Sequence, residues 1–191
     1  MSAHDFNDAE PQRSFDVIPD GTVATVRMTV RPGSAGEGGW LRRSKDGESE
    51  ALDCEFVVLD GPYAKRKFWS LFTVGGTAPG HTEAAKISNA KLRAILESAR
   101  GIKPDDKSDT AKEARWTNSY GDFNGLSFIV RIGVEAPQNG YKAKNRLDRV
   151  VTPDEKAWHP VTQAPAVASP TTPTKPASTP AKIERPAWAK E

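Results

Sequence analysis

Several segments of the chain alternate apolar and polar residues with a period of two, the pattern of a β-strand with one buried face. Residues rich in turn formers, among them Asp60-Gly61-Pro62 and Asn139-Gly140, separate these segments. The pattern predicts strands at Thr22–Arg31, Ala51–Leu59, Lys65–Val74, Leu126–Val134 and Tyr141–Val151.

One segment has helical spacing instead. Within Thr82–Arg100, the apolar residues Leu92, Leu96 and Ala99 recur every three or four positions, and Gly101 follows as a typical helix-ending residue. The expected order is three strands, a helix and two strands (β-β-β-α-β-β). An all-β fold with one helix in this place is typical of a five-stranded OB-fold-like barrel.

The two ends of the chain differ in composition from the middle. Residues 1–14 are polar and lack periodicity, and the chain from Val161 onward is rich in Pro, Ala, Thr and Ser. Such segments cannot bury enough apolar surface to offset the entropy of ordering. We therefore expect a flexible segment at 1–14, an OB-like domain at 15–153 and a disordered tail at 154–191.

The net charge of the chain does not indicate a particular class of binding partner. The 191 residues include 27 Lys and Arg against 25 Asp and Glu, a net charge of +2, so any binding signal must come from local clusters. No apolar stretch approaches the length of a bilayer span, and the start Met1-Ser2-Ala3-His4 lacks the features of an export signal. We expect a soluble, cytoplasmic protein.

The sequence offers little catalytic or metal-binding chemistry. Cys54 is the single cysteine and lies in a strand-like setting, which indicates a buried residue and excludes an internal disulfide. The three histidines, His4, His81 and His159, are far apart and share no metal-ligand spacing with a carboxylate or thiol. We therefore expect no enzyme, no metal, no cofactor and no catalytic residue.

A rival interpretation starts from the glycine-rich segment Gly75–Thr82, which has the glycine spacing of a phosphate-binding loop. His81 stands where such a loop has its lysine. A nucleotide-hydrolysing fold also requires a parallel α/β scaffold, which one helix cannot supply. The pattern therefore argues against nucleotide hydrolysis.

Cations and aromatic rings cluster on the expected second, third and fifth strands and on the flexible loop Gly33–Gly39 with the residues that follow it. Cations can follow the phosphates of a single strand while rings stack on its unpaired bases. The candidate nucleic-acid-binding residues are Trp40, Arg42, Arg43, Lys65, Arg66, Lys67, Trp69, Arg131, Lys142, Lys144 and Arg146, and further aromatic contacts come from Trp116, Tyr120 and Phe123 in a long loop at 103–124.

Two alternatives remain open. In the first alternative, the cations are ordinary solvated residues that Asp53, Glu55 and Asp148 neutralise, and the rings cap the ends of the barrel. Alternatively, the rings of the 103–124 loop form a protein contact, which makes the chain an interaction or assembly module without nucleic-acid binding. Each single residue fits the first alternative, whereas the whole set favours binding.

With Phe15–Thr22, Glu55–Tyr63, Lys65–Trp69, Phe123–Phe128 and Asn145–Leu147 in view, the chain resembles a family of bacteriophage and prophage proteins. These proteins are regarded as single-stranded-DNA-binding-like and are encoded among replication and recombination functions. The resemblance implies an OB-like module that coats single strands, with no reaction and no cofactor. It supplies no set of contact residues.

The leading hypothesis is a non-enzymatic single-stranded-DNA-binding protein of phage or prophage origin that acts in replication or recombination. It would hold phosphates through Lys65–Lys67 and Lys142–Arg146 and stack bases on Trp69 and Trp40. The expected partners are single-stranded DNA, replication or recombination proteins and a second copy of the chain. The patterns leave base preference, oligomeric state and the choice between DNA and RNA open.

Overall fold

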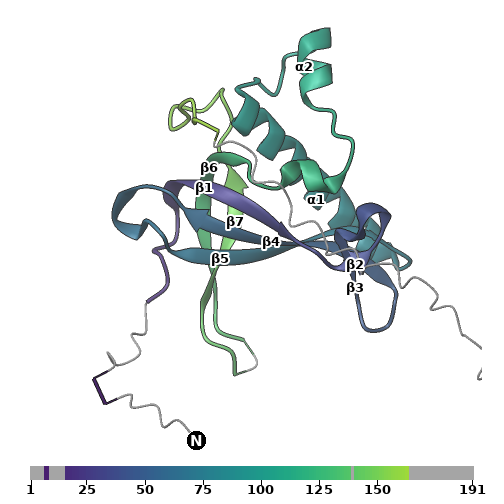
Figure 1. Cartoon of the computed structure of the whole chain (residues 1–191), viewed down its shortest axis with the longest axis vertical. Helices are drawn as coiled ribbons and strands as arrows, with labels where there is room; N and C mark the ends of the chain where they lie inside the picture. Colours follow the sequence, from purple (N-terminus) through teal and green to yellow (C-terminus); the bar gives the residue numbers. More distant parts are fainter. Residues whose placement is uncertain (1–6, 9–15, 139, 164–191) are drawn as a thin grey trace, which may run out of the picture.

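A seven-stranded antiparallel sheet forms the centre of the computed structural model, which describes residues 7–8, 16–138 and 140–163 (Figure 1). Its strands are β1 Thr22–Arg31, β2 Ser34–Ala35, β3 Leu41–Arg43, β4 Ser49–Val58, β5 Lys67–Gly76, β6 Ser127–Glu135 and β7 Lys144–Val150. The remaining elements are helix α1 Pro79–Arg100, the short helix α2 Asp109–Ala114, and the 3-10 turns η1 Glu37–Gly39, η2 Gly61–Tyr63 and η3 Tyr120–Phe123. A mostly-β fold with one main helix is thus confirmed.

The sheet is open, so the expected OB-like barrel is not confirmed. β1 pairs with β4 and β6, β4 pairs with β5, and β6 pairs with β7. Within the described residues no ladder joins β5 to β7, where a closed barrel would have its last pairing. A hydrogen bond from Leu147 N–H to Ser70 Oγ crosses this opening at 2.9 Å. Helix α1 packs against both strands at the opening.

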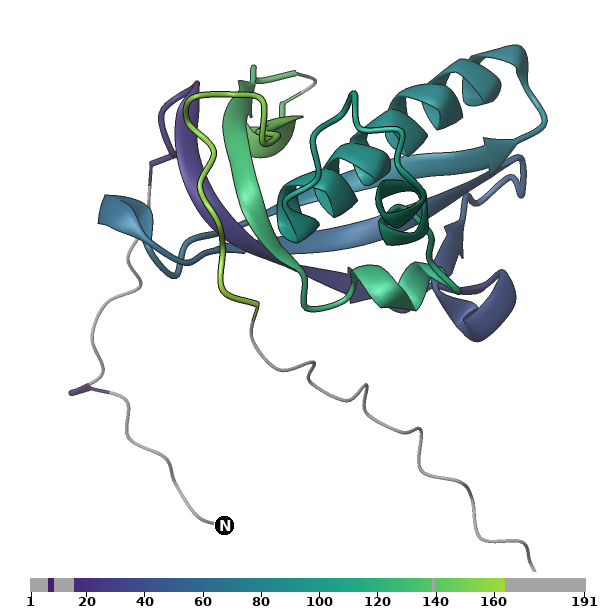
Figure 2. The same cartoon turned by 90° about the horizontal axis from the view of Figure 1, so that it is seen from above.

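The core lies between the inner face of the curved sheet and α1. The rings of Phe56 and Phe68 stack at 5.1 Å between centroids, and Phe128 meets Phe56 edge-on at 6.2 Å. From α1, Leu92 and Ile95 are buried against these strands. Figure 2 shows α1 lying over the sheet. This packing fixes β5, β7 and α1 relative to one another.

The expected flexible loop after β1 is folded instead. It contains β2, η1 and β3, with Ser34 paired to Arg42 and Ala35 paired to Leu41. Gly33 permits this hairpin because a Cβ there would lie 2.3 Å from the carbonyl oxygen of Leu41. The glycines that suggested flexibility in the sequence therefore allow close approach and positive φ angles in a folded turn.

The fifth predicted strand, Tyr141–Val151, is shorter than expected, since β7 begins only at Lys144. Tyr141 forms an isolated bridge with Gln138 in the hairpin between β6 and β7. The pairing of β6 with β7 also shifts between Arg131 and Ile132. A bulge of this kind interrupts the two-residue period that the sequence prediction followed.

The domain extends past the predicted boundary at residue 153. The indole of Trp158 donates to the carbonyl oxygen of Ser98 at 3.1 Å, and Gln163 exchanges two hydrogen bonds with the backbone of Ser127 at 2.7 and 2.9 Å. This segment follows β7 and runs beside β1 and β6 (Figure 2). Residues 154–163 therefore belong to the domain. The predicted tail at 164–191, and all of 1–14 except residues 7–8, lie outside the described residues.

Candidate nucleic-acid interface

The opening between β5 and β7 forms a groove. Its cavity has a volume of about 400 Å³ and is bounded by β5, β7 and the first half of α1. We call it the β5–β7 groove and define it by Trp69, Leu71, Ile87, Lys91, Lys144 and Arg146. Strands from distant parts of the sequence thus bring three predicted residues, Trp69, Lys144 and Arg146, to one cavity.

One wall of the β5–β7 groove is apolar and exposed. The alternation along β5 turns Phe68 and Phe72 into the core and leaves Trp69 and Leu71 outside, with 48% and 59% of their surface exposed. The indole N–H of Trp69 donates to Glu55 Oε2 at 3.2 Å, which fixes the edge of the ring while its face stays accessible. An exposed, oriented indole is suited to stacking on a planar ligand.

The opposite wall carries two cations. Lys144 and Arg146 both point outward from β7, because residues two apart on a strand share a face. Lys144 pairs with Glu135 at 3.3 Å, and Arg146 approaches Asp148 at 3.9 Å. Such surface pairs contribute only about 0–1 kcal/mol, so a phosphate can replace the carboxylate at little cost. The wall can therefore accept an anionic ligand.

The floor of the groove contains Lys91, which the sequence prediction did not include. Its Nζ donates to the carbonyl oxygen of Leu147 at 3.2 Å. Burial lowers the pKa of Lys91, the charge of Asp148 raises it, and Arg146 lowers it further. The signal that would have revealed this residue is its helical spacing: Lys91 stands four residues, about one helical turn, from both Ile87 and Ile95.

The hairpin between β6 and β7 extends the groove. Tyr141, with 78% of its surface exposed, and Lys142 line a smaller cavity that also contacts Lys144 and Glu135. In Figure 1 this hairpin projects from the sheet on the side away from α1. Lys142 therefore lies in a loop beside the groove, and not on a strand as predicted.

The remaining predicted cations lie around the sheet and not in the groove. Lys67 pairs with Glu55 at 2.7 Å, two residues along β5 from Trp69, and Arg42 pairs with Asp53 at 3.4 Å. These carboxylates are two of those that the first alternative named. Arg43 pairs with Glu50 at 2.7 Å. All three cations thus have a carboxylate partner, two of them one that the first alternative named, and each remains partly exposed.

Three further cations occupy other positions. Lys65 lies in the turn before β5 with a φ of 69°, and the guanidinium of neighbouring Arg66 donates to the carbonyl oxygen of Asp16. Arg131 lies on the outer face of β6 opposite Val23. Among the described residues, no carboxylate pairs with Lys65 or Arg131. The structure does not bring these three residues to the β5–β7 groove.

Several predicted rings pack against the domain instead of facing outward. Phe123 has only 4% of its surface exposed and belongs to the core, so its predicted role as a contact residue is wrong. Trp40 and Tyr120 are partly buried against that core. The ring of Trp40 lies so close to Gly121 that a Cβ there would approach it to 2.7 Å. We call Trp40, Tyr120, Gly121 and Phe123 the capped end of the sheet.

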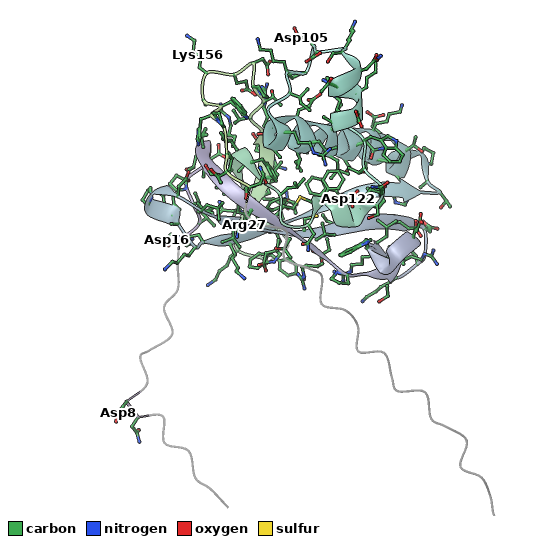
Figure 3. The ribbon with its side chains drawn as sticks, turned by 45° about the horizontal axis from the view of Figure 1, so that its top comes forward. Asp8, Asp16, Arg27, Asp105, Asp122 and Lys156 are labelled. Atoms are coloured by element: carbon green, nitrogen blue, oxygen red, sulfur yellow. The ribbon has the colours of Figure 1, made fainter. Side chains whose placement is uncertain are left out.

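The 103–124 segment is a long loop that contains α2 and η3, and buried ion pairs hold it against α1. Glu97 of α1, with 3% of its surface exposed, pairs with Arg115 at 2.7 Å and with Arg93 at 2.8 Å. Arg115 also donates to the backbone carbonyl oxygen of Lys103 at 2.9 Å. Figure 3 shows Asp105 near α2 at the outer end of this segment and Asp122 closer to the sheet. Trp116, 69% exposed, is the ring that this segment leaves outside.

Other chemistry is sparse in the described part of the chain. No group of three or more histidine, cysteine or acidic residues there is arranged to hold a metal ion. Burial raises the pKa of the Cys54 thiol, so the thiol stays protonated and unreactive. The glycine-rich segment at the end of β5 leads from an antiparallel sheet into α1, without the parallel strand that a phosphate-binding loop requires. None of the described helices has the length and apolarity needed to cross a membrane.

Comparisons with protein-family models, with curated proteins and with solved structures found no match to this chain.

Proposed function

We propose that the protein binds single-stranded DNA in the β5–β7 groove, without catalysing a reaction. The observation that carries this proposal is that an apolar wall and a cationic wall line the same cavity. Trp69 and Leu71 on β5 form the exposed apolar wall, and Lys144 and Arg146 on β7 form the cationic wall. A single strand presents bases along one side and phosphates along the other. An apolar wall opposite a cationic wall matches that arrangement.

The strand order supports an OB-like module as the scaffold. The order β5-β4-β1-β6-β7, with α1 between β5 and β6, is the connectivity of a five-stranded Greek-key barrel that is partly open between its third and fifth long strands. OB-folds bind oligonucleotides across their second and third strands and between the loops that flank them. Here those elements are β4, β5, the β2–β3 hairpin and the β6–β7 hairpin, of which β5 and the β6–β7 hairpin adjoin the β5–β7 groove.

The balance of charge supports reversible binding. The net charge is only +2, and carboxylates accompany Lys67, Lys144 and Arg146. A phosphate that replaces such a carboxylate releases bound counterions from the DNA, which makes the affinity fall as salt rises. Binding should therefore be moderate and strongly dependent on salt.

A titration of labelled oligothymidine at two salt concentrations, with duplex DNA as competitor, tests the proposal. We expect salt-sensitive binding that prefers the single strand. Trp69→Ala should weaken it by about 1–3 kcal/mol, the usual contribution of one stacking ring. Trp116→Ala is the matched control, because this tryptophan is also exposed but lies outside the groove.

The result of this titration distinguishes single-stranded-DNA binding from the alternative in which the chain is a protein-interaction module. If the wild-type protein does not bind the single strand at low salt, the proposal fails and the exposed Trp116 becomes the first surface to test for a protein contact. If Trp116→Ala weakens binding and Trp69→Ala does not, the site has been assigned to the wrong face. Phage or prophage origin and a role in replication or recombination remain predictions from the resemblance, as do the cytoplasmic location and the DNA-processing partners.

A further inference from the structure

Lys91 occupies a different depth from the other cations of the groove. Lys144 and Arg146 are exposed at the rim, whereas Lys91 is partly buried on α1 and lines the same cavity beneath them. Rim cations are accessible to a phosphate backbone that runs along the surface. A cation on the floor is reached by a group that enters the cavity, and a base of a single strand can do so.

The ammonium group of Lys91 has more hydrogen-bond donors than partners among the described residues. It carries three N–H groups, and one of them donates to the carbonyl oxygen of Leu147. The other two have no partner among the described residues. Partial burial, which lowers the pKa of this group, also leaves these donors fewer waters than a fully exposed ammonium has. A ligand that supplies two acceptors would therefore gain more here than at the rim.

A donor-only group distinguishes the two purines. Guanine presents O6 and N7 as adjacent acceptors, whereas adenine presents N7 beside an N6 amino donor. Both purines offer the same ring system for stacking on Trp69. The cavity of about 400 Å³ falls within the range of about 300–1,000 Å³ that small-ligand sites occupy, so it has room for a planar base.

We propose that Lys91 is a specificity-determining residue that donates to O6 and N7 of a guanine stacked against Trp69 in the β5–β7 groove. This inference rests on the proposed function and goes beyond it by naming the preferred base. The competing role for Lys91 is a third phosphate contact, which would strengthen binding to every sequence equally. Base preference separates the two roles.

The test uses the full-length chain and labelled oligothymidines in which one central base is guanine, hypoxanthine, 7-deazaguanine or adenine. We expect guanine and hypoxanthine, which both carry O6 and N7, to bind about fivefold or more tighter than adenine. The 7-deazaguanine strand should lose part of this gain, because it lacks N7. Lys91→Met should abolish the preference, and Lys91→Arg should retain it, since arginine also donates to both acceptors.

Lys86→Met is the matched control, because Lys86 lies on the same helix, pairs with Glu83 at 3.7 Å and is exposed outside the groove. It should keep both affinity and preference. Circular dichroism of each variant checks that it is folded. Equal affinity of the wild-type protein for guanine and adenine overturns the inference while leaving the proposed function standing. A Lys91→Met variant that weakens all strands equally and flattens the salt slope also overturns it. A wild-type protein that binds none of the strands refutes the proposed function itself.

Discussion

The β5–β7 groove and the capped end of the sheet both carry aromatic rings, yet the fold uses those rings in opposite ways. In the groove, Trp69 stands on a strand whose outer face has no layer over it, so nearly half of its surface is exposed. At the capped end, Phe123 and Tyr120 belong to a 3-10 turn that folds back over β1. A ring on an uncovered sheet face is available to a ligand, whereas a ring in a returning loop serves to cover the core.

Removing one ring from each region should give the largest difference in the free energy of unfolding. Phe123→Ala should lower the free energy of unfolding by about 3–5 kcal/mol, since it leaves a cavity in the core. Trp69→Ala should lower it by about 1 kcal/mol or less, because the ring is exposed. Urea unfolding of the two variants measures both effects. Equal losses of stability would contradict the distinction between the two regions.

The sequence carried more information about the fold than about the site. Alternation placed β1 at its observed bounds, Thr22–Arg31, and Gly101 marked the end of α1 with a φ of 69°. These are local features that one segment determines by itself. The opening between β5 and β7 depends instead on how far two strands with 67 residues between Gly76 and Lys144 approach each other, and no local pattern encodes that distance.

The residues of the candidate site were predicted only in part, for the same reason. Trp69, Lys144 and Arg146 were found because strand alternation sets which way they point. Lys91 was missed because it stands on a helix face that was interpreted only as core. Phe123 was predicted to be an aromatic contact, because a turn-rich sequence does not show that the turn folds back onto the core. Burial in loops is a tertiary property, so it cannot be predicted from the period of the residues.

The buried ion pairs of Glu97, which join α1 to Arg115 of the 103–124 segment, offer the next test. Glu97→Gln removes the buried carboxylate charge that faces Arg93 and Arg115. We expect the free energy of unfolding to fall by about 3 kcal/mol, the lower end for a broken buried pair, because Arg93 is partly exposed. Binding of single-stranded DNA per folded molecule should stay unchanged. Urea unfolding and the oligothymidine titration measure the two properties, and a loss of affinity at full folding would connect the regions that we treat as separate.

The two cations of the groove wall should affect affinity and not stability. Lys144→Ala combined with Arg146→Ala should reduce the slope of log affinity against log salt by about 1.4, since each phosphate contact to a single strand contributes about 0.7. The matched control is Lys86→Ala combined with Lys112→Ala, which removes the same charge from two exposed lysines that are also paired with carboxylates. Both pairs of substitutions should leave urea unfolding nearly unchanged. An equal reduction of slope in the control would mean that net charge, and not the groove, holds the strand.

The smallest effect concerns the tyrosine of the capped end. Burial raises the pKa of Tyr120 above its ordinary value of 10.0, and the charge of Glu50 raises it further. Because the folded state then holds the phenolic proton more tightly than the unfolded state, the contribution of Tyr120 to stability is complete below pH 10 and declines as the pH rises above it. Tyr120→Phe removes this dependence, so the stability of the wild-type protein should fall more steeply than that of the variant between pH 9 and pH 11. Urea unfolding of both proteins across this range isolates Tyr120 from the other groups that titrate there. Parallel curves would mean that the phenol of Tyr120 is as well solvated as that of a free tyrosine, and the capped end would then be as open to ligands as the groove.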